Sequence, residues 1–284
     1  MTKLSLHRLT RAGLATVAAL ALVACNKPQE AAPVTAAGSA PSAASARTYV
    51  VGTDAAYAPF ESQNEKGEIV GFDIDVVSAV AKKAGIEVKF VNTPWEGIFN
   101  ALAQGDRDLL ISSITITDAR RQTMDFSEPY FDAAQLIAAP ASSPIARFDD
   151  LKALKVGVQT GTTGDEVVTK LQGKNSTNIK RFESTPLALK ELEAGGLDAV
   201  VADNGVVINY LANNTTAQFK SVTDRAFQPE HYGIAVKKGN TELLDKLNKG
   251  LGEIRSDGTY EKLYAQYFGA AAAAAAAPAS AASK

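Results

Sequence analysis

Two stretches of the chain repeat one another, and this repeat restricts the fold more than any other feature. Leu102–Ser113 (LAQGDRDLLISS) aligns with Leu192–Asp203 (LEAGGLDAVVAD), with a leucine, a glycine and an aspartate at matching places. Each stretch leaves a helical pattern at its glycine and enters an apolar run, which is typical of a strand covered on both faces. A chain that carries one helix–strand unit twice is expected to build two lobes of similar design.

The residues around the repeat alternate between strand and helix patterns. In order, the predicted elements are a strand at Val50–Asp54, a helix at Gly71–Gly85, a strand at Val88–Val91, a helix at Pro94–Ala103, a strand at Leu109–Ile114, a strand at Lys155–Val158, helices at Asp165–Leu171 and Thr185–Gly195, and a strand at Leu197–Ala202. Asp73 and Thr185 are the expected N-caps of two of these helices. The alternation predicts an α/β protein in which each lobe is a mainly parallel sheet flanked by helices.

Two amphipathic helices, Thr241–Arg255 and Thr259–Phe268, close the predicted series. The chain is therefore expected to cross between the lobes twice, near Tyr130–Ala134 and near Gln228–Gly233. Two crossing strands form a hinge suited to closure around a ligand. The predicted boundaries place residues 47–132 plus 231–269 in lobe 1 and residues 133–230 in lobe 2.

The start of the chain predicts export. Lys3, Arg8 and Arg11 precede an apolar run that ends at Ala24, too short for a spanning helix of about 20 residues and typical of a cleaved signal peptide over 1–24. Leu22–Cys25 resembles the lipobox of bacterial lipoproteins, which implies lipidation of Cys25, the single cysteine. Residues 25–46 are predicted to be a flexible, lipid-anchored linker, and 270–284 an Ala-rich disordered tail. The expected location is periplasmic, tethered to a membrane.

Charge and composition exclude several function classes. Without Lys3, Arg8 and Arg11, 26 lysines and arginines remain against 31 acids, a net charge of −5. No basic cluster interleaved with aromatic residues occurs, so nucleic acid is not an expected partner. Beyond the signal peptide only His231 remains, and no metal-binding, phosphate-binding or nucleophile motif is present, so no metal, no cofactor and no enzyme activity are expected.

Opposite charges follow the predicted strands of the two lobes. Arg120 suits a carboxylate because its guanidinium donates two parallel hydrogen bonds, and Asp203 suits an ammonium group. Ser112, Ser113 and Thr115 add hydroxyls near Arg120. These groups together predict a site for a free amino acid. In the alternative interpretation Arg120 forms a surface ion pair and Asp203 caps the helix that starts at Asn204.

Five segments resemble the polar amino acid solute-binding proteins of ABC importers: Thr53–Glu61, Gly71–Asp75, Ser113–Asp118, Asp125–Tyr130 and Asp257–Tyr260. This family includes histidine-, lysine/arginine/ornithine- and glutamine-binding proteins, and the resemblance implies its two-lobe periplasmic-binding-protein-like fold. It also implies roles for the residues that match the family's motifs. Arg120 and the amide of Thr163 would bind the ligand carboxylate, Asp203 its ammonium group, and Ser113 and Thr115 both ends.

The resemblance also implies which residues face the ligand side chain. Tyr57 and Trp95 would stack on it, and Asp54 and Gln159 would face its terminus; core packing is the alternative role for the two aromatic residues. Arginine is favoured through cation–π contact, whereas Gln159 leaves glutamine open and Asp54 also suits histidine. The implied partner is the membrane permease of an ABC importer, served by a monomer. A ligand-sensing lipoprotein and a dehydratase-type enzyme remain alternatives.

Overall fold

The computed structural model describes residues 47–214 and 218–270. The signal peptide, Cys25, the linker and the tail beyond Ala270 lie outside these residues, so their predictions stand as they were made. Within the described ranges, no helix is long and apolar enough to cross a membrane.

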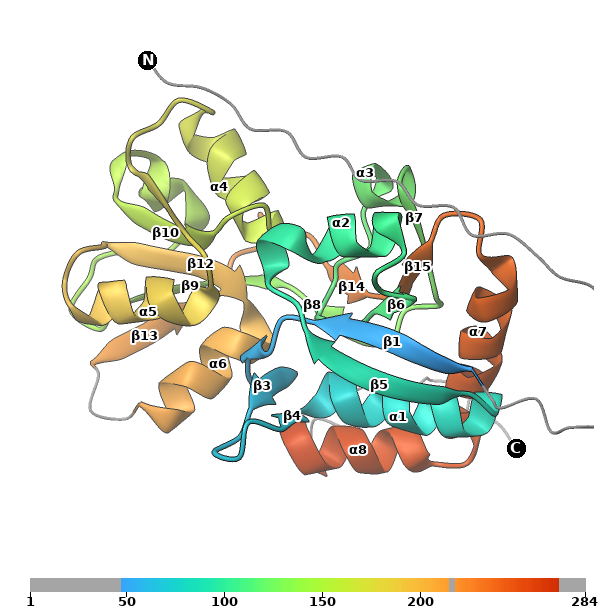
Figure 1. The fold of residues 1–284 in the computed structure, drawn as a ribbon. Coiled ribbons are helices and arrows are strands. Elements are labelled where there is room, and N and C mark those ends of the chain that lie inside the picture. Colours follow the sequence, from blue (N-terminus) through green and yellow to red (C-terminus); the bar gives the residue numbers. More distant parts are fainter. Residues whose placement is uncertain (1–46, 215–217, 271–284) are drawn as a thin grey trace, which may run out of the picture. The chain divides into compact units, whose positions relative to one another are not determined.

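The first sheet has five strands in the order β5-β1-β6-β15-β7 (Figure 1). The three strands β5, β1 and β6 are parallel, and β15 is antiparallel to β6 and to β7. The strands are β1 (Thr48–Thr53), β5 (Glu87–Asn92), β6 (Leu109–Leu110), β7 (Met124–Phe126) and β15 (Ala235–Lys237). The helices of this part are α1 (Phe72–Ala84), α2 (Trp95–Gln104), α3 (Asp118–Arg121), α7 (Thr241–Ser256) and α8 (Thr259–Phe268), and a small sheet contains β2 (Ala56–Tyr57), β3 (Glu61–Gln63) and β4 (Ile69–Val70).

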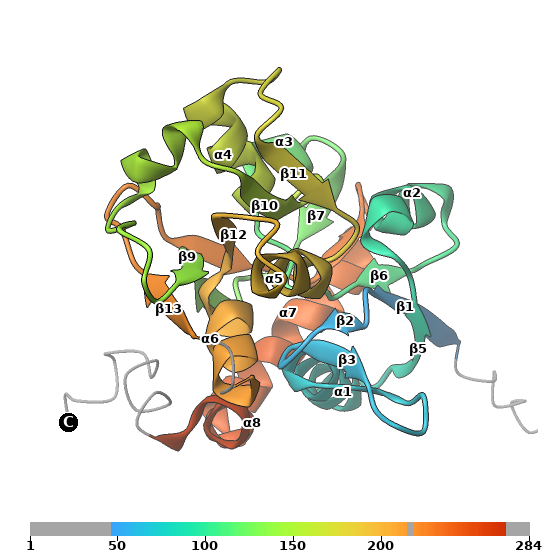
Figure 2. The ribbon, with the colours of Figure 1, turned by 90° about the vertical axis from the view of Figure 1, so that its left-hand side faces the viewer.

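The second sheet repeats this plan with the order β11-β10-β12-β9-β13. Strands β11, β10 and β12 are parallel, and β9 is antiparallel to β12 and to β13. The strands are β9 (Gln135–Pro140), β10 (Val156–Gln159), β11 (Ile179–Phe182), β12 (Ala199–Asp203) and β13 (Phe219–Val222). The helices are the 3₁₀ helix η1 (Phe148–Ala153), α4 (Thr163–Gln172), α5 (Thr185–Glu193) and α6 (Asn204–Asn213), and Figure 2 shows α5 and α6 toward the viewer.

Two short antiparallel strands, β8 (Phe131–Ala133) and β14 (Glu230–Tyr232), form a separate sheet. Along the chain, each of them stands between a strand of one large sheet and a strand of the other. The strand that follows each of them, β9 after β8 and β15 after β14, takes the antiparallel position in its sheet. The predicted α/β class, with two sheet-and-helix lobes joined by two strands, is confirmed.

The sequence repeat has the same hydrogen bonds in both sheets. The carboxylate of Asp108 accepts from the backbone N–H of Val50 at 2.7 Å, and Asp198 accepts from the N–H of Lys155 at 2.7 Å. Gly105 and Gly195, which precede these aspartates, both have positive φ, 88° and 77°. Each aspartate thus ties the start of one strand to the loop that enters its parallel neighbour.

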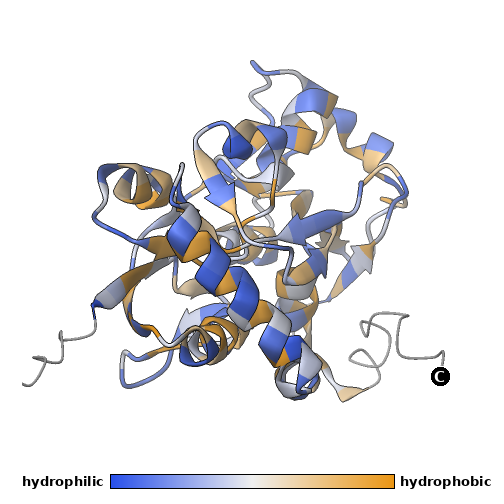
Figure 3. Cartoon of the chain, turned by 90° about the vertical axis from the view of Figure 1, so that its right-hand side faces the viewer, coloured by the Kyte–Doolittle hydropathy of each residue, from blue (hydrophilic) through white to orange (hydrophobic). Residues whose placement is uncertain are grey.

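Side chains on alternate residues of a strand face opposite sides of a sheet, and the apolar cores follow this rule. Ile111 belongs to the large core under α1, α7 and α8, whereas Leu110 belongs to the core under α2. In β12, Val201 packs with α4 and Val200 with α5. Both faces of each sheet are therefore covered, and the helices carry alternating hydrophobic and hydrophilic stretches (Figure 3).

Three details of the predicted elements are wrong. Helix α1 begins after Gly71, and Asp73 does not cap it but lies fully buried as an acceptor for Ser113. Ser184 holds the N-cap position of α5, and Thr185 is its first residue. The strand expected over Leu109–Ile114 is limited to Leu109–Leu110, and Ser113, three residues further on, has a φ of 48°.

Candidate ligand-binding site

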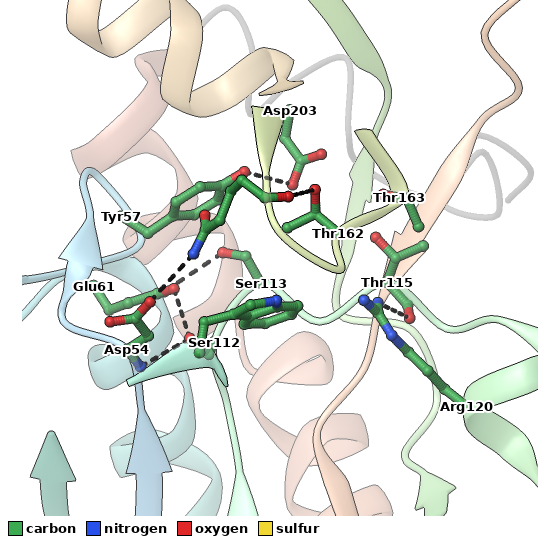
Figure 4. Close-up of a pocket in the computed structure, with 12 residues that line it drawn as sticks. Asp54, Tyr57, Glu61, Ser112, Ser113, Thr115, Arg120, Thr162, Thr163 and Asp203 are labelled. Atoms are coloured by element: carbon green, nitrogen blue, oxygen red, sulfur yellow. Dashed lines mark hydrogen bonds between the residues drawn. The ribbon is translucent and has the colours of Figure 1, made fainter. Parts of the chain in front are cut away.

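A cavity of about 330 Å³ lies where the carboxyl ends of the central strands meet. All of the predicted site residues line it, together with two that were not predicted, Glu61 and Thr162 (Figure 4). The lining residues are Asp54, Tyr57, Glu61, Trp95, Ser112, Ser113, Thr115, Arg120, Gln159, Thr162, Thr163 and Asp203.

Strand ends supply the polar groups of this cavity. Asp54 directly follows β1, and Ser112 lies two residues after the end of β6. Gln159 and Asp203 are the last residues of β10 and β12. Ligands bind at this edge of open α/β sheets because the strands end there and leave the loops free to carry side chains. Both sheets therefore contribute polar groups to the cavity. Within the part of the first sheet, Asp54 and Arg120 lie far apart along the cavity, as Figure 4 shows.

Arg120 lies in the short helix α3, whose N-cap Thr117 accepts a hydrogen bond from the Arg120 N–H. Its Nη1 donates to the carbonyl of Thr115 at 2.8 Å, and its guanidinium lies 5.3 Å from the ring centres of both Trp95 and Phe99. Burial lowers the pKa of Arg120, although a guanidinium stays charged. In the described part of the chain Arg120 forms no ion pair, so the surface-pair alternative has no support there.

Asp203 holds the N-cap position of α6, but its side chain makes no capping hydrogen bond. Its carboxylate accepts instead from the hydroxyls of Tyr57 at 2.9 Å and Tyr232 at 2.6 Å and from the amide of Gln135. Burial, and then the charge of Glu230, raise the pKa of Asp203 to about 6. Asp203 as a whole residue is 7% exposed, and its side chain lines the cavity. A cation in the cavity would offset the free-energy cost of burying this carboxylate.

Asp54 and Gln159 meet at the opposite end of the cavity. Gln159 Nε2 donates to Asp54 at 3.4 Å and to the carbonyl of Glu183 at 3.1 Å, while Gln159 Oε1 accepts from Thr185 at 3.0 Å. The amide of Gln159 is thus oriented with its N–H groups toward Asp54. Burial raises the pKa of Asp54 to about 6, and the backbone N–H of Trp95 opposes this shift. Thr185, expected as a cap, fixes this amide instead.

Glu61 was missed as a lining residue, although it stands at the end of the motif Thr53–Glu61. It is fully buried and accepts from the hydroxyls of Ser112 at 3.0 Å and Ser113 at 3.5 Å. Asp73 lies beside it, and Asp73 Oδ1 has no hydrogen-bond partner among the described residues. Burial, and then the charge of Asp73, raise the pKa of Glu61 well above its usual range, because both disfavour its charged form.

The two aromatic residues both line the cavity and are half-buried, which distinguishes them from core aromatics such as Phe60 and Phe72. Trp95 packs edge-on to Phe99 with ring centres 5.0 Å apart. Tyr57 points its hydroxyl at Asp203, as Figure 4 shows. Tyr57 also packs against the core under α1, and Trp95 against the core under α2, so each ring combines core packing with a place in the cavity lining.

The loop Gly161–Gly164 begins α4 beside the cavity. Thr162 is its N-cap and accepts from the N–H of Asp165 at 3.2 Å, and Thr163 is the first helical residue. A helix N-terminus presents unpaired N–H groups that favour an anion. Across residues 47–214 and 218–270, no group of three or more histidine, cysteine or acidic side chains is arranged to hold a metal ion.

Two sheet-and-helix lobes with a polar, charged cavity at their strand ends define a solute-binding protein. The chain belongs to the bacterial extracellular solute-binding proteins, family 3, whose model matches residues 49–270.

Three proteins similar to this chain are compared with it. The "Probable histidine-binding protein" of Neisseria gonorrhoeae is 45% identical over 251 residues, 88% of this chain and 91% of that protein. The arginine-, lysine-, histidine-binding protein ArtJ of Geobacillus stearothermophilus has a TM-score of 0.76 and 43% identity, covering 78% of this chain and 96% of ArtJ. The ancestral amino acid-binding protein AncCDT-1, a precursor of cyclohexadienyl dehydratase, has a TM-score of 0.71 and 39% identity, covering 78% and 95%.

Proposed function

We propose that this chain is an exported lipoprotein that captures a basic amino acid, arginine before lysine and histidine, and delivers it to the permease of an ABC importer. The observation that carries the proposal is the distribution of charge in the cavity. One cation, Arg120, lies at one end, and the carboxyl groups of Asp203, Asp54 and Glu61 are among the other lining groups. An amino acid that complements this lining has one carboxylate and two cationic groups.

The backbone of the ligand is assigned to the Arg120 end. Arg120, the amide of Thr163 and the N-terminus of α4 would bind the carboxylate. Asp203 would bind the ammonium group, with Ser112, Ser113 and Thr115 supplying hydroxyls and backbone groups between the two. A buried carboxylate without a cation is costly, so an ammonium group near Asp203 stabilises the complex.

The ligand side chain is assigned to the Asp54 end. Asp54 is the acceptor there, and Gln159 presents N–H groups to it rather than to a ligand. This orientation disfavours Gln159 as the reader of a glutamine side chain and favours a cationic terminus that meets Asp54. Tyr57 and Trp95 would flank an arginine guanidinium through cation–π contact. The relatives named for histidine, arginine and lysine support the same ligand class.

Capture is proposed to follow hinge closure between lobe 1, residues 47–132 plus 231–269, and lobe 2, residues 133–230. Hydrogen bonds already join groups of the two parts around the cavity, including Tyr57 to Asp203 and Arg120 to the carbonyl of Gly161 at 3.5 Å. The strands β8 and β14 are the proposed hinge. A monomer held at the periplasmic side of a membrane through Cys25 would present the loaded form to the permease.

A calorimetric screen of the twenty L-amino acids against the purified protein tests this proposal. We expect arginine, lysine and histidine to bind, with arginine at least about 10-fold tighter than glutamine, a difference of about 1.4 kcal/mol. Tight binding of only neutral or acidic amino acids would reject the ligand class. No binding by any of the twenty would reject amino acid capture altogether.

A dehydratase-type enzyme is the second candidate, favoured by one feature of the cavity. Asp54, with a pKa raised to about 6, lies in the same lining as Glu61, whose pKa is raised well above its usual range, and such a pairing suits acid–base chemistry. The likeness to a dehydratase precursor points the same way. Incubation with prephenate-type acids, followed by product analysis, separates the candidates, because a binding protein returns its ligand unchanged.

A further inference from the structure

Glu230, the first residue of the linking strand β14, lies beside the cavity without lining it. One of its carboxylate oxygens, Oε2, accepts from the hydroxyl of Thr115 at 2.6 Å and from the hydroxyl of Thr163 at 2.9 Å. The other oxygen, Oε1, accepts from Gln135 Nε2 at 3.0 Å. Glu230 is therefore joined to the loop after β6, to the start of α4 and to the start of β9.

These hydrogen bonds fix the direction of the two hydroxyls. A threonine hydroxyl has one hydrogen to donate and two lone pairs that accept. Because Thr115 gives its only hydrogen to Glu230, its oxygen is left as an acceptor. Thr163 gives its hydrogen to the same carboxylate. Thr115 and Thr163 are 5% and 9% exposed, and with Glu230 they also border a second, open hollow.

The hydroxyl oxygen of Thr115, held as an acceptor, favours a ligand group that donates a hydrogen bond. Asp203, which lines the same cavity, is the formal charge at this place, and the amide of Gln135 donates to both Asp203 and Glu230. An α-ammonium group has three hydrogens to donate and needs several acceptors. A methylene group in its place has no hydrogen to donate and would leave the oxygen of Thr115 without a hydrogen-bond partner.

We propose that Glu230 is a positioning residue: it holds the Thr115 hydroxyl as an acceptor for the α-ammonium group of the ligand, and its bonds to Thr115 and Thr163 tie the two walls of the cavity to the linking strand. This inference rests on the proposed capture of an amino acid. It adds a residue outside the lining that selects α-amino acids from their des-amino analogues.

The test compares two ligands on four proteins. L-Arginine and 5-guanidinopentanoate, which lacks only the α-amino group, are titrated into the wild type, Glu230→Ala, Glu230→Gln and the control Glu65→Gln. Glu65 is exposed in the turn after β3 and does not line the cavity. Binding is followed by calorimetry and by the fluorescence of Trp95, the single tryptophan of the chain.

We expect Glu230→Ala to weaken L-arginine binding by about 10-fold or more, the range for a lost hydrogen bond to a charged group, and 5-guanidinopentanoate by less than about 3-fold. Glu230→Gln keeps an acceptor for the hydroxyls and is expected to recover most of the loss. Glu65→Gln is expected to match the wild type.

Three outcomes are distinguishable. An equal loss for both ligands in Glu230→Ala, or wild-type affinity for L-arginine, overturns the positioning role. If the wild type binds another amino acid in place of arginine, that amino acid and its des-amino analogue take their places, because the argument concerns the shared α-ammonium group. If the wild type binds no amino acid, the proposed function fails, and this inference fails with it.

Discussion

The hydroxyl of Tyr57 donates a 2.9 Å hydrogen bond to the carboxylate of Asp203, although 146 residues separate them in the chain. Tyr57 lies in β2 of the small three-stranded sheet, in the same part of the chain as the first large sheet. Asp203 is the last residue of β12 in the second large sheet. The bond therefore connects the two walls of the cavity directly. It also directs the carboxylate that the proposed function assigns to the ligand's ammonium group.

Removing this hydroxyl tests the connection. Tyr57→Phe is expected to weaken L-arginine binding by about 10-fold, because a buried carboxylate loses one of its charge-assisted donors. Calorimetric titration measures the loss. Tyr49→Phe is the matched control, since the hydroxyl of Tyr49 makes no hydrogen bond to another described residue. Equal affinities for Tyr57→Phe and the wild type would show that the bond is dispensable for capture.

Arg120 and its neighbour Arg121 form a natural pair for testing the carboxylate end. Arg120→Ala is expected to weaken binding by about 30-fold or more, because removing one member of a buried charge pair costs about 2–5 kcal/mol. Arg121 is exposed and does not line the cavity, so Arg121→Ala is expected to bind like the wild type. Calorimetry on both variants decides; similar losses, or none in Arg120→Ala, would contradict the assignment.

The affinity for L-arginine is expected to rise as pH rises through 6. Asp203 and Asp54 have pKa values near 6 in the cavity without ligand, because burial disfavours their charged forms. A cationic ligand favours the ionised forms and lowers both pKa values, so binding releases protons near pH 6 and weakens below it. Each group contributes at most about 10-fold per pH unit.

Titrations at pH 5 and pH 7.5, each in two buffers of different ionisation enthalpy, measure this linkage. The expected result is at least about 10-fold weaker binding at pH 5 and a buffer-dependent heat near pH 6. Circular dichroism at both pH values establishes that the protein stays folded. Identical affinities at both pH values would mean that neither carboxyl group changes protonation when the ligand binds.

Glu61 makes the stability of the fold depend on pH in a second, separate way. Its pKa is raised in the folded state by burial and by Asp73, so its favourable contribution is complete below the unfolded value of about 4.3 and is lost as pH rises through the folded value. Glu61→Gln removes this dependence, since the amide does not titrate.

The free energy of unfolding of Glu61→Gln, relative to the wild type, is therefore expected to increase between pH 5 and pH 8, by at most about 1.4 kcal/mol per pH unit. Urea unfolding at several pH values measures it. Glu65→Gln, in the exposed turn after β3, is the control and should follow the wild type at each pH. A constant difference across the pH range would mean that Glu61 is ionised in the folded protein.

Gly71 is expected to tolerate no side chain. Its φ is 139°, and a Cβ there would lie 2.1 Å from the carbonyl oxygen of Phe60, which is part of the backbone and cannot move aside. Gly71→Ala is expected to lower the free energy of unfolding by about 3 kcal/mol or more, from strain and overpacking together. In Gly67→Ala nothing lies within 4 Å of the new Cβ, so only the strain of its φ of 77° is expected, about 1 kcal/mol. Thermal unfolding of the two variants side by side gives the comparison.

Much of the fold was readable from local pattern. The repeat of Leu102–Ser113 in Leu192–Asp203 predicted two similar sheets, and Asp108 and Asp198 bind equivalent backbone groups. The helices near the C-terminus agree with their predicted limits within a residue. These predictions succeed because hydrophobic period and helix-stop glycines act over a few residues, which a sequence displays directly.

The misplaced residues share a different physical origin. Asp73 and Thr185 have the side chains of helix caps, yet each bonds to a distant residue, Ser113 and Gln159. A local cap competes with a buried partner that folding brings near, and in a site that excludes water the buried polar group must be matched. Glu61 and Glu230 were not assigned to the ligand site for the same reason, because their partners lie 51 and 115 residues away.

The sequence by itself determined the order of strands and helices, the two-lobe plan and the chemical types of side chain at the strand ends, because these depend on short-range pattern. Only the tertiary structure decided which carboxyl groups have a raised pKa, which hydroxyl is left as an acceptor, and which charges face the same cavity. Those properties depend on burial and on distances of a few ångströms between residues far apart in the chain, and such distances exist only after the sheets have formed.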